Sequence, residues 1–152
     1  MAAGLCPVAA AGTMLERLNS AALLRADSQT IETISILGLG YVGLPAAALF
    51  ALSGKRVLGV DTNPLTVEKI SAGDCLIVEP HLPERVAAAV DSGRLTASCK
   101  PGPADAYIIA VPTPFHPGSH APDISYVEAA LRSIAPHIRR GGLIVLESTS
   151  PV

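Results

Sequence analysis

The chain has 152 residues, of which 49% are hydrophobic and 16% are charged, and its formal net charge is −2. This length is typical of one domain, and the composition excludes an intrinsically disordered chain, which combines low hydrophobicity with high net charge. The nearly neutral charge argues against a nucleic-acid-binding domain. Three widely spaced cysteines (Cys6, Cys75 and Cys99) argue against a disulfide framework or a zinc site and fit a reducing cytoplasm.

The first 30 residues have the pattern of an N-terminal extension. Residues 14–25 have the spacing of a short amphipathic helix, and residues 26–30 are polar. Residues 1–12 are apolar, but the first positive residue is Arg17, so the positive charge that should precede the apolar part of a signal peptide is missing. We therefore expect an extension over residues 1–30 and a folded domain over residues 31–152.

Within that domain, apolar β-branched segments alternate with segments of helical periodicity. The pattern predicts strands at residues 33–37, 56–60, 95–98, 106–111 and 143–146. It predicts helices at residues 42–52, 64–72, 82–92 and 125–139, the last with Val127, Ala130, Leu131, Ile134 and Ile138 on its apolar side. Such alternation predicts an α/β fold: a Rossmann-type doubly wound parallel sheet of five or six strands with helices on both faces.

Residues 34–54 carry no charge and are numerous enough to cross a bilayer. However, Gly38, Gly40, Gly43 and Pro45 interrupt the run, and its composition changes from β-branched to Ala/Leu-rich. We interpret it as a strand, a turn and a helix, and retain a membrane span as the alternative.

The glycine motif, residues 38–43 (Gly-Leu-Gly-Tyr-Val-Gly), lies between the first predicted strand and the first predicted helix. This is the context of a dinucleotide-binding fingerprint. There Gly38 would make the tight turn, Gly40 would let the backbone approach a pyrophosphate, and Gly43 would let helix and strand pack closely. The amides at the helix start would face the anion.

Asp61 follows the second predicted strand, 18 residues after Gly43. A carboxylate at this place accepts hydrogen bonds from ribose hydroxyls and repels a 2′-phosphate, and no arginine follows it. The motif and Asp61 together predict NAD binding in preference to NADP. In the alternative interpretation, Asp61 caps the helix that begins near Pro64.

Two threonines follow the predicted strands at residues 106–111 and 143–146. Thr113 and Thr149 lie in loops at the carboxyl ends of these strands, where such sheets bind ligands. Both are candidates for hydrogen bonds to the nicotinamide half of NAD. Threonine and proline are equally common in ordinary tight loops, so position alone leaves both interpretations open.

Four segments, ISILGLGYVGLP, VLGVDTN, AVPTP and ESTSPV, together resemble the amino-terminal domain of the UDP-glucose/GDP-mannose dehydrogenase family. The resemblance covers residues 33–152 and implies an enzyme that oxidises the C6 alcohol of a sugar nucleotide to a carboxylate with two NAD. It implies cofactor contacts at Tyr41, Val42, Asp61, Thr113 and Thr149. It also implies a cytoplasmic homo-oligomer that supplies polysaccharide precursors, with no nucleic-acid or membrane partner.

The family's catalytic cysteine, lysine and asparagine match no residue of this sequence. We therefore expect no catalytic residue and no metal site in this chain, and we expect the UDP-sugar to bind only in the full-length enzyme. Cys75 and Cys99 are expected to be inert packing residues. His116 and His120 are four residues apart, but Pro117 and Gly118 between them argue against a metal-binding helix.

Two other interpretations stay open. A β-hydroxyacid dehydrogenase also begins with a glycine fingerprint, although the YVGLP segment and the Pro-Thr-Pro and Ser-Thr loops argue against it. The second interpretation is a non-catalytic module that only binds NAD.

Overall fold

A computed structural model of the chain describes residues 30–115 and 122–147. By its internal contacts the chain divides into two units, residues 1–30 and 31–152, and the described part belongs almost wholly to the second. Its strands are β1 (Thr33–Leu37), β2 (Arg56–Val60), β3 (Leu95–Ser98), β4 (Ala106–Ile109) and β5 (Leu143–Leu146). Its helices are α2 (Gly43–Leu52), α3 (Pro64–Ser71), α4 (Leu82–Asp91), α5 (Ser125–Ile134) and the short 3-10 helix η1 (Ala135–His137).

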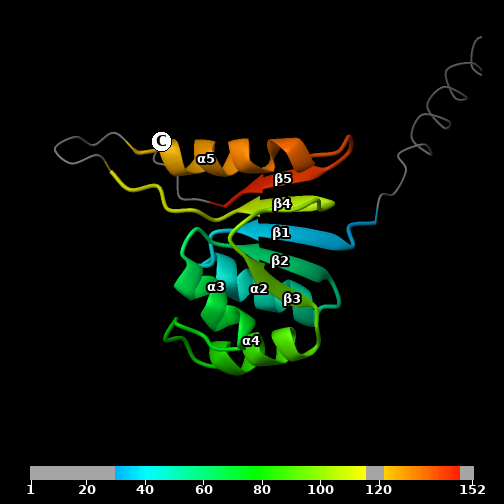
Figure 1. The fold of residues 1–152 in the computed structure, drawn as a ribbon, viewed down its shortest axis with the longest axis vertical. Coiled ribbons are helices and arrows are strands. Elements are labelled where there is room, and N and C mark those ends of the chain that lie inside the picture. The colour runs from blue at the N-terminus through cyan, green and yellow to red at the C-terminus, as the bar shows by residue number, and fades with distance from the viewer. Residues whose placement is uncertain (1–29, 116–121, 148–152) are drawn as a thin grey trace, which may run out of the picture. The chain divides into compact units, whose positions relative to one another are not determined.

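All five strands are parallel and lie in the order β3-β2-β1-β4-β5. Helices α2, α3 and α4 cover one face of the sheet and α5 covers the other (Figure 1). The predicted doubly wound sheet is therefore confirmed, with five strands. The strand order reverses between β1 and β4, and sheets of this kind bind ligands at the carboxyl ends of the strands beside that reversal.

The uncharged run of residues 34–54 folds as β1, the glycine motif and α2. Helix α2 ends at Leu52, and Ser53 and Gly54 follow it; the Gly54 φ of +101° is one that a glycine adopts readily. Among the helices of the described residues, none combines the length and hydrophobicity that a membrane span requires. The membrane-span interpretation of this run is therefore wrong.

The sheet separates two apolar clusters. One side packs Ile36 against Leu44 of α2 and Val86 of α4, while the other packs Tyr107 and Ile109 against α5. Strand β4 is buried along its whole length, as its continuous apolar sequence predicts for a strand covered on both faces. The core thus packs against both faces of β1 and β4, the two strands on either side of the strand-order reversal.

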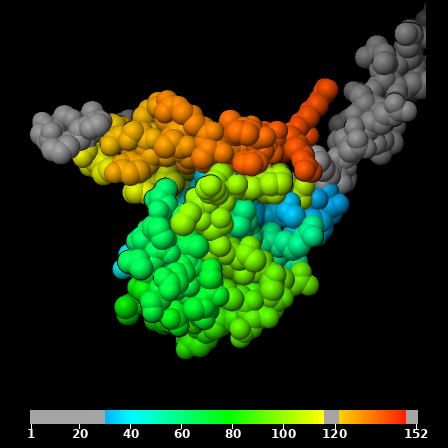
Figure 2. Space-filling view, viewed as in Figure 1, coloured from blue at the N-terminus to red at the C-terminus, as the bar shows by residue number. Residues whose placement is uncertain are grey.

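Two predicted elements end two or more residues earlier than expected. The helix predicted over residues 125–139 ends at Ile134 and continues only as η1, because Pro136 has no N–H to donate within a helix. Of its expected apolar side only Ala130 and Ile134 are buried, and α5 exposes its outer surface along the domain (Figure 2). Strand β4 stops at Ile109 rather than residue 111, close to Pro112.

Asp105 joins the beginnings of β1 and β4. Its Oδ2 accepts hydrogen bonds from the Thr33 hydroxyl at 2.7 Å and from the amides of Thr33 and Glu32 at 2.8 and 3.0 Å. The Thr33 hydroxyl in turn accepts from the Asp105 amide at 3.0 Å. The Thr33 hydroxyl most of all, and then these two amides, lower the pKa of Asp105, because hydrogen bonds to a carboxylate stabilise its charged form.

Asp105→Asn is expected to lower the free energy of unfolding by about 1.5 kcal/mol at pH 7, because the amide makes weaker bonds than the carboxylate. A carboxyl whose pKa is lower in the folded state stabilises the fold above its unfolded pKa, and this stabilisation disappears as the pH falls through the folded value. Urea unfolding should therefore show the gap between wild type and Asp105→Asn shrinking below pH 3.8, the ordinary pKa of the group. A gap that stays constant with pH would contradict this role.

The matched control is Asp91→Asn. Asp91 is exposed in the last turn of α4. We expect this variant to change the free energy of unfolding by less than about 0.5 kcal/mol, with no such dependence on acid pH.

Candidate functional site

The glycine motif begins with a turn that only glycine fits. Gly38 has a φ of +91°, and its amide donates to the Val60 carbonyl of β2 at 2.8 Å. A Cβ on Gly38 would lie 2.6 Å from the Ala110 carbonyl oxygen, and a Cβ on Gly43 would lie 1.8 Å from the Gly38 carbonyl oxygen. The two glycines therefore allow β1, β4 and the start of α2 to approach one another closely.

The start of α2 presents unpaired backbone amides. In residues 30–115 and 122–147, the amides of residues 40–43 have no hydrogen-bond acceptor, and Val42 makes no side-chain cap. A Cβ on Gly40 would meet no atom within 4 Å, so this part of the motif faces open space. No acidic residue lies in the first turn of α2. Amides that point outward from a helix N-terminus form a favourable site for an anion.

Tyr41 and Val42 lie at the surface beside these amides. The Tyr41 side chain is 76% exposed and that of Val42 is 50% exposed, although both are large and apolar in part. Exposed apolar groups next to unpaired amides are typical of a ligand site. There an organic molecule covers the apolar side chains, and its anionic group binds the amides.

Asp61 lies directly after β2, beside the motif. Its Oδ2 accepts from the Leu39 amide at 3.0 Å, and its Oδ1 accepts from the Asn63 amide at 2.9 Å. The carboxylate is partly exposed, and each oxygen can accept a further hydrogen bond. The two backbone amides therefore orient the group and leave it able to bind hydroxyls.

The cap of α3 is Asn63 rather than Asp61. The Asn63 side chain accepts from the Leu65 amide at 3.0 Å, and Pro64 occupies the first turn. The alternative interpretation of Asp61 as the helix cap is therefore wrong. Asn63 had no role in the sequence analysis, although an asparagine immediately before a helix-starting proline is a recognisable cap signal.

The two threonine candidates differ in what the structure describes. Thr113 is half-buried in the segment that follows β4 at the same edge of the sheet as the glycine motif. This segment is held to the start of α5 by the Asp123 amide, which donates to the Pro114 carbonyl at 2.7 Å. Thr149, His116 and His120 lie outside the described residues.

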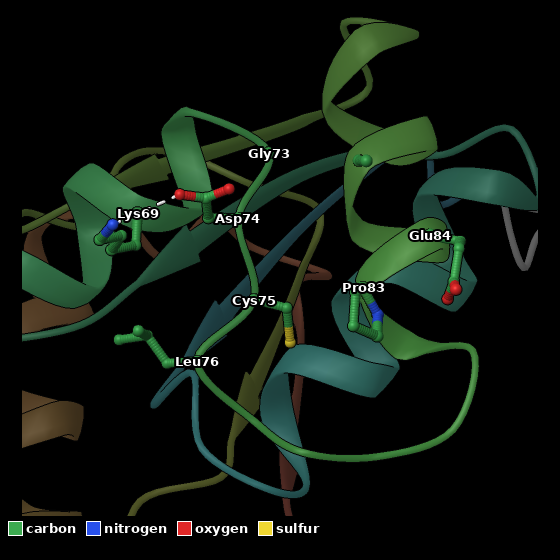
Figure 3. A pocket seen from close by; sticks show the side chains of 8 residues that line it. Lys69, Gly73, Asp74, Cys75, Leu76, Pro83 and Glu84 are labelled. Atoms are coloured by element: carbon green, nitrogen blue, oxygen red, sulfur yellow. Dashed lines mark hydrogen bonds and ion pairs between the residues drawn. The ribbon is translucent and has the colours of Figure 1, made fainter.

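A separate pocket of about 480 Å³ lies between the end of α3 and the start of α4 (Figure 3). Lys69 and Asp74 point toward each other at its rim, with Nζ and Oδ2 3.4 Å apart. Cys75 lines the pocket, packs against the core and has its Sγ 3.4 Å from the Ile77 carbonyl oxygen. None of the lining residues belongs to the glycine motif or to the Asp61 loop.

The expectation of a packing role holds for Cys75 and is wrong for Cys99, which is exposed just beyond the edge strand β3. Within the part of the chain that the structure describes, no group of three or more His, Cys, Asp and Glu side chains is arranged to hold a metal ion.

Comparisons with known proteins place the chain in one family. The profile described as "UDP-glucose/GDP-mannose dehydrogenase family, NAD binding domain" matches residues 32–152. A UDP-N-acetyl-D-mannosamine dehydrogenase of Escherichia coli (strain K12) is 57% identical over 123 residues, which are 81% of this chain and 29% of that protein. An NDP-N-acetyl-D-galactosaminuronic acid dehydrogenase of Ralstonia nicotianae is 53% identical over 84% of this chain and 30% of its own length.

Solved structures give the same result. A UDP-N-acetyl-mannosamine dehydrogenase from Staphylococcus aureus superimposes with a TM-score of 0.75 at 43% identity, over 77% of this chain and 29% of that one. A UDP-glucose dehydrogenase from Pyrobaculum islandicum has a TM-score of 0.71 at 41% identity, over 82% and 30% of the two chains. The chain thus spans less than a third of the length of these relatives.

Proposed function

Because the chain belongs to the UDP-glucose/GDP-mannose dehydrogenase family, of which it contains the NAD-binding domain, we propose that its glycine motif and Asp61 hold the NAD of a UDP-N-acetyl-D-mannosamine dehydrogenase. One observation carries the assignment of the site. Unpaired amides at residues 40–43, an open Gly40 and the oriented Asp61 carboxylate lie together at the carboxyl ends of β1 and β2. These groups are complementary to a ligand in which an anionic group, bound by the amides, is followed by a pair of ribose hydroxyls that donate to the carboxylate.

Each group has a separate task in this proposal. The amides of residues 40–43 bind the pyrophosphate, and Asp61 accepts hydrogen bonds from the adenosine ribose. A 2′-phosphate would bring negative charge against Asp61, so NADP is disfavoured. Tyr41 and Val42 cover the cofactor from the solvent side, and Thr113 and Thr149 bind its nicotinamide half.

The substrate proposal rests on the relatives' names and identities. NAD would supply the hydride acceptor for this reaction. Oxidation of a C6 alcohol to a carboxylate would consume two NAD and one water: each NAD would take up one hydride, the water would supply the second carboxylate oxygen, and three protons would be released. The substrate proposed is UDP-N-acetyl-D-mannosamine, with oxidation to the uronate. UDP-glucose is the alternative, supported by the P. islandicum likeness. The sugar nucleotide binds in the full-length enzyme, proposed as a cytoplasmic homo-oligomer that supplies polysaccharide precursors.

Calorimetric titration of the purified chain tests the cofactor proposal. We expect saturable binding of NAD, and NADP binding weaker by about tenfold or more, because one repelled or unpaired charge costs on the order of 1.4 kcal/mol or more. Absence of NAD binding by a chain whose circular dichroism shows a folded α/β domain would contradict the proposal. Equal affinities for both cofactors would contradict the role of Asp61 alone.

Asp61→Ala is expected to weaken NAD binding about tenfold or more, because hydrogen bonds to a charged acceptor are lost. The preference for NAD over NADP should shrink as well, because the carboxylate no longer repels the 2′-phosphate. Titration of both cofactors, with urea unfolding of the same variant, separates affinity from stability. Asp91→Ala serves as the control, because Asp91 is exposed at the far end of α4. An unchanged NAD affinity in Asp61→Ala would refute this role.

A further inference from the structure

Gly59 in β2 lies directly beneath the glycine motif. A Cβ on Gly59 would lie 2.9 Å from both Cδ1 and Cδ2 of Leu39, closer than real Cβ atoms approach other heavy atoms. Leu39 stands between the two leading glycines of the motif, yet its side chain is only 3% exposed and belongs to the core beneath α2. The Leu39 side chain therefore packs directly against the β2 backbone at Gly59.

The same residue carries the amide that orients Asp61. The Leu39 side chain points into the core against Gly59, and its amide donates to Asp61 Oδ2 at 3.0 Å. One residue thus joins the packing under the motif to the carboxylate beside it.

We infer that Gly59 is a positioning residue of the cofactor site. Because Gly59 has no side chain, Leu39 can pack directly against β2, and in that position the Leu39 amide orients the Asp61 carboxylate for hydrogen bonds to the ribose. The inference rests on the proposed function for its cofactor part. It goes further by assigning a positioning role to a buried residue of β2 that lies outside the glycine motif.

The surroundings leave a larger side chain at position 59 little room. Residue 59 lies in a parallel strand whose pleat fixes the direction of its Cβ, and it is paired with Ile36 of β1 and Ala97 of β3. Gly38, which precedes Leu39, is also attached to β2, because its amide donates a hydrogen bond to the Val60 carbonyl at 2.8 Å. An added methyl group must therefore displace the end of the Leu39 side chain. Because Leu39 is 3% exposed and packed in the core, we expect the displacement to reach its backbone and to lengthen the hydrogen bond from the Leu39 amide to Asp61.

Gly59→Ala tests the inference with two readouts on the same protein. We expect NAD affinity to fall about tenfold, the equivalent of losing one hydrogen bond to a charged group. We also expect the Leu39 amide to exchange its hydrogen about tenfold faster, as measured by NMR, because its acceptor is lost. Gly102→Ala is the matched control, since its Cβ would meet only Leu58 Cδ2 at 3.4 Å.

The double variant Gly59→Ala/Leu39→Val supplies the rescue. Valine lacks the two Cδ atoms that the new methyl group would strike, so we expect NAD affinity and Leu39-position amide exchange to return to within about threefold of wild type. If Gly59→Ala does not fold, the double variant is compared with Leu39→Val alone. The double variant should then bind NAD more tightly than Leu39→Val, because the alanine methyl group fills the space that valine leaves empty.

Wild-type affinity in folded Gly59→Ala, or a double variant that stays as weak as Gly59→Ala, would overturn the inference. A wild-type chain that does not bind NAD would instead overturn the proposed function. In that case the exchange rate of the Leu39 amide alone decides whether Gly59 positions Leu39 against Asp61.

Discussion

Gly43→Ala is expected to lower the free energy of unfolding by about 3 kcal/mol and to weaken NAD binding by roughly 100-fold. A Cβ at this position would lie 1.8 Å from the Gly38 carbonyl oxygen and 3.4 Å from the Ala110 Cβ. The first contact is with backbone, which has no alternative rotamer to adopt. Helix α2 must therefore move away from the β1 turn, and the amides at its start leave their positions over the site.

Gly40→Ala is the matched control, since an added methyl group at Gly40 meets no atom within 4 Å. Its free energy of unfolding should change by less than about 1 kcal/mol. Urea unfolding of both variants measures the contrast, and NAD titration is made on the folded proteins. Equal losses of stability in Gly43→Ala and Gly40→Ala would show that close packing of α2 on the turn is not what Gly43 provides.

Tyr107→Phe is expected to lower the free energy of unfolding by about 2 kcal/mol. The Tyr107 side chain is fully buried, and its hydroxyl accepts from the Ala104 amide at 2.9 Å. The same hydroxyl lies 3.2 Å from the Gly102 carbonyl oxygen and 3.1 Å from that of His137. Phenylalanine keeps the ring but leaves a buried amide without its acceptor, and it removes the link between β4 and η1.

Tyr126→Phe is the control for this prediction. Tyr126 lies on α5 and is 49% exposed, so water can hydrogen-bond to its hydroxyl. Its loss of stability should stay below about 0.5 kcal/mol. Thermal or urea unfolding distinguishes the two variants, and a Tyr107→Phe protein as stable as Tyr126→Phe would show that the buried hydroxyl contributes nothing.

The stability of the scaffold and the chemistry of the site depend on opposite ends of the same strands. Asp105 clamps the amino ends of β1 and β4, while the glycine motif and Asp61 occupy the carboxyl ends of β1 and β2. Variants at the first end should therefore change unfolding without changing NAD affinity in the folded protein.

Edge strand β5 shows the limit of reading burial from composition. Its four residues, Leu-Ile-Val-Leu, are all apolar, and each is between 37% and 52% exposed. The equally apolar β4 is fully buried. The difference comes from position in the sheet, since β4 has a strand on either side and β5 has only β4.

The sequence by itself determined the local elements and the nature of the site. Four of five strands have the predicted bounds, because short β-branched runs between glycine, proline and polar residues leave few alternatives. The predicted helix over residues 125–139 extended past the observed end at Ile134, although Pro136 in the sequence is a signal for a helix end. The glycine motif and Asp61 predicted a dinucleotide site because their spacing reflects a strand, a turn and a helix in succession.

Only the tertiary structure decided which atoms meet across the sheet. Three contacts depend on the register of neighbouring strands and on helix placement. They are the hydrogen bond from the Leu39 amide to Asp61, the packing of Leu39 against Gly59, and the contact of the Tyr107 hydroxyl with the His137 carbonyl. These pairs are separated by 20 to 30 residues in the chain, and no local pattern encodes them. Packing selects them, because a one-residue change of register would turn every side chain of a strand to the opposite face.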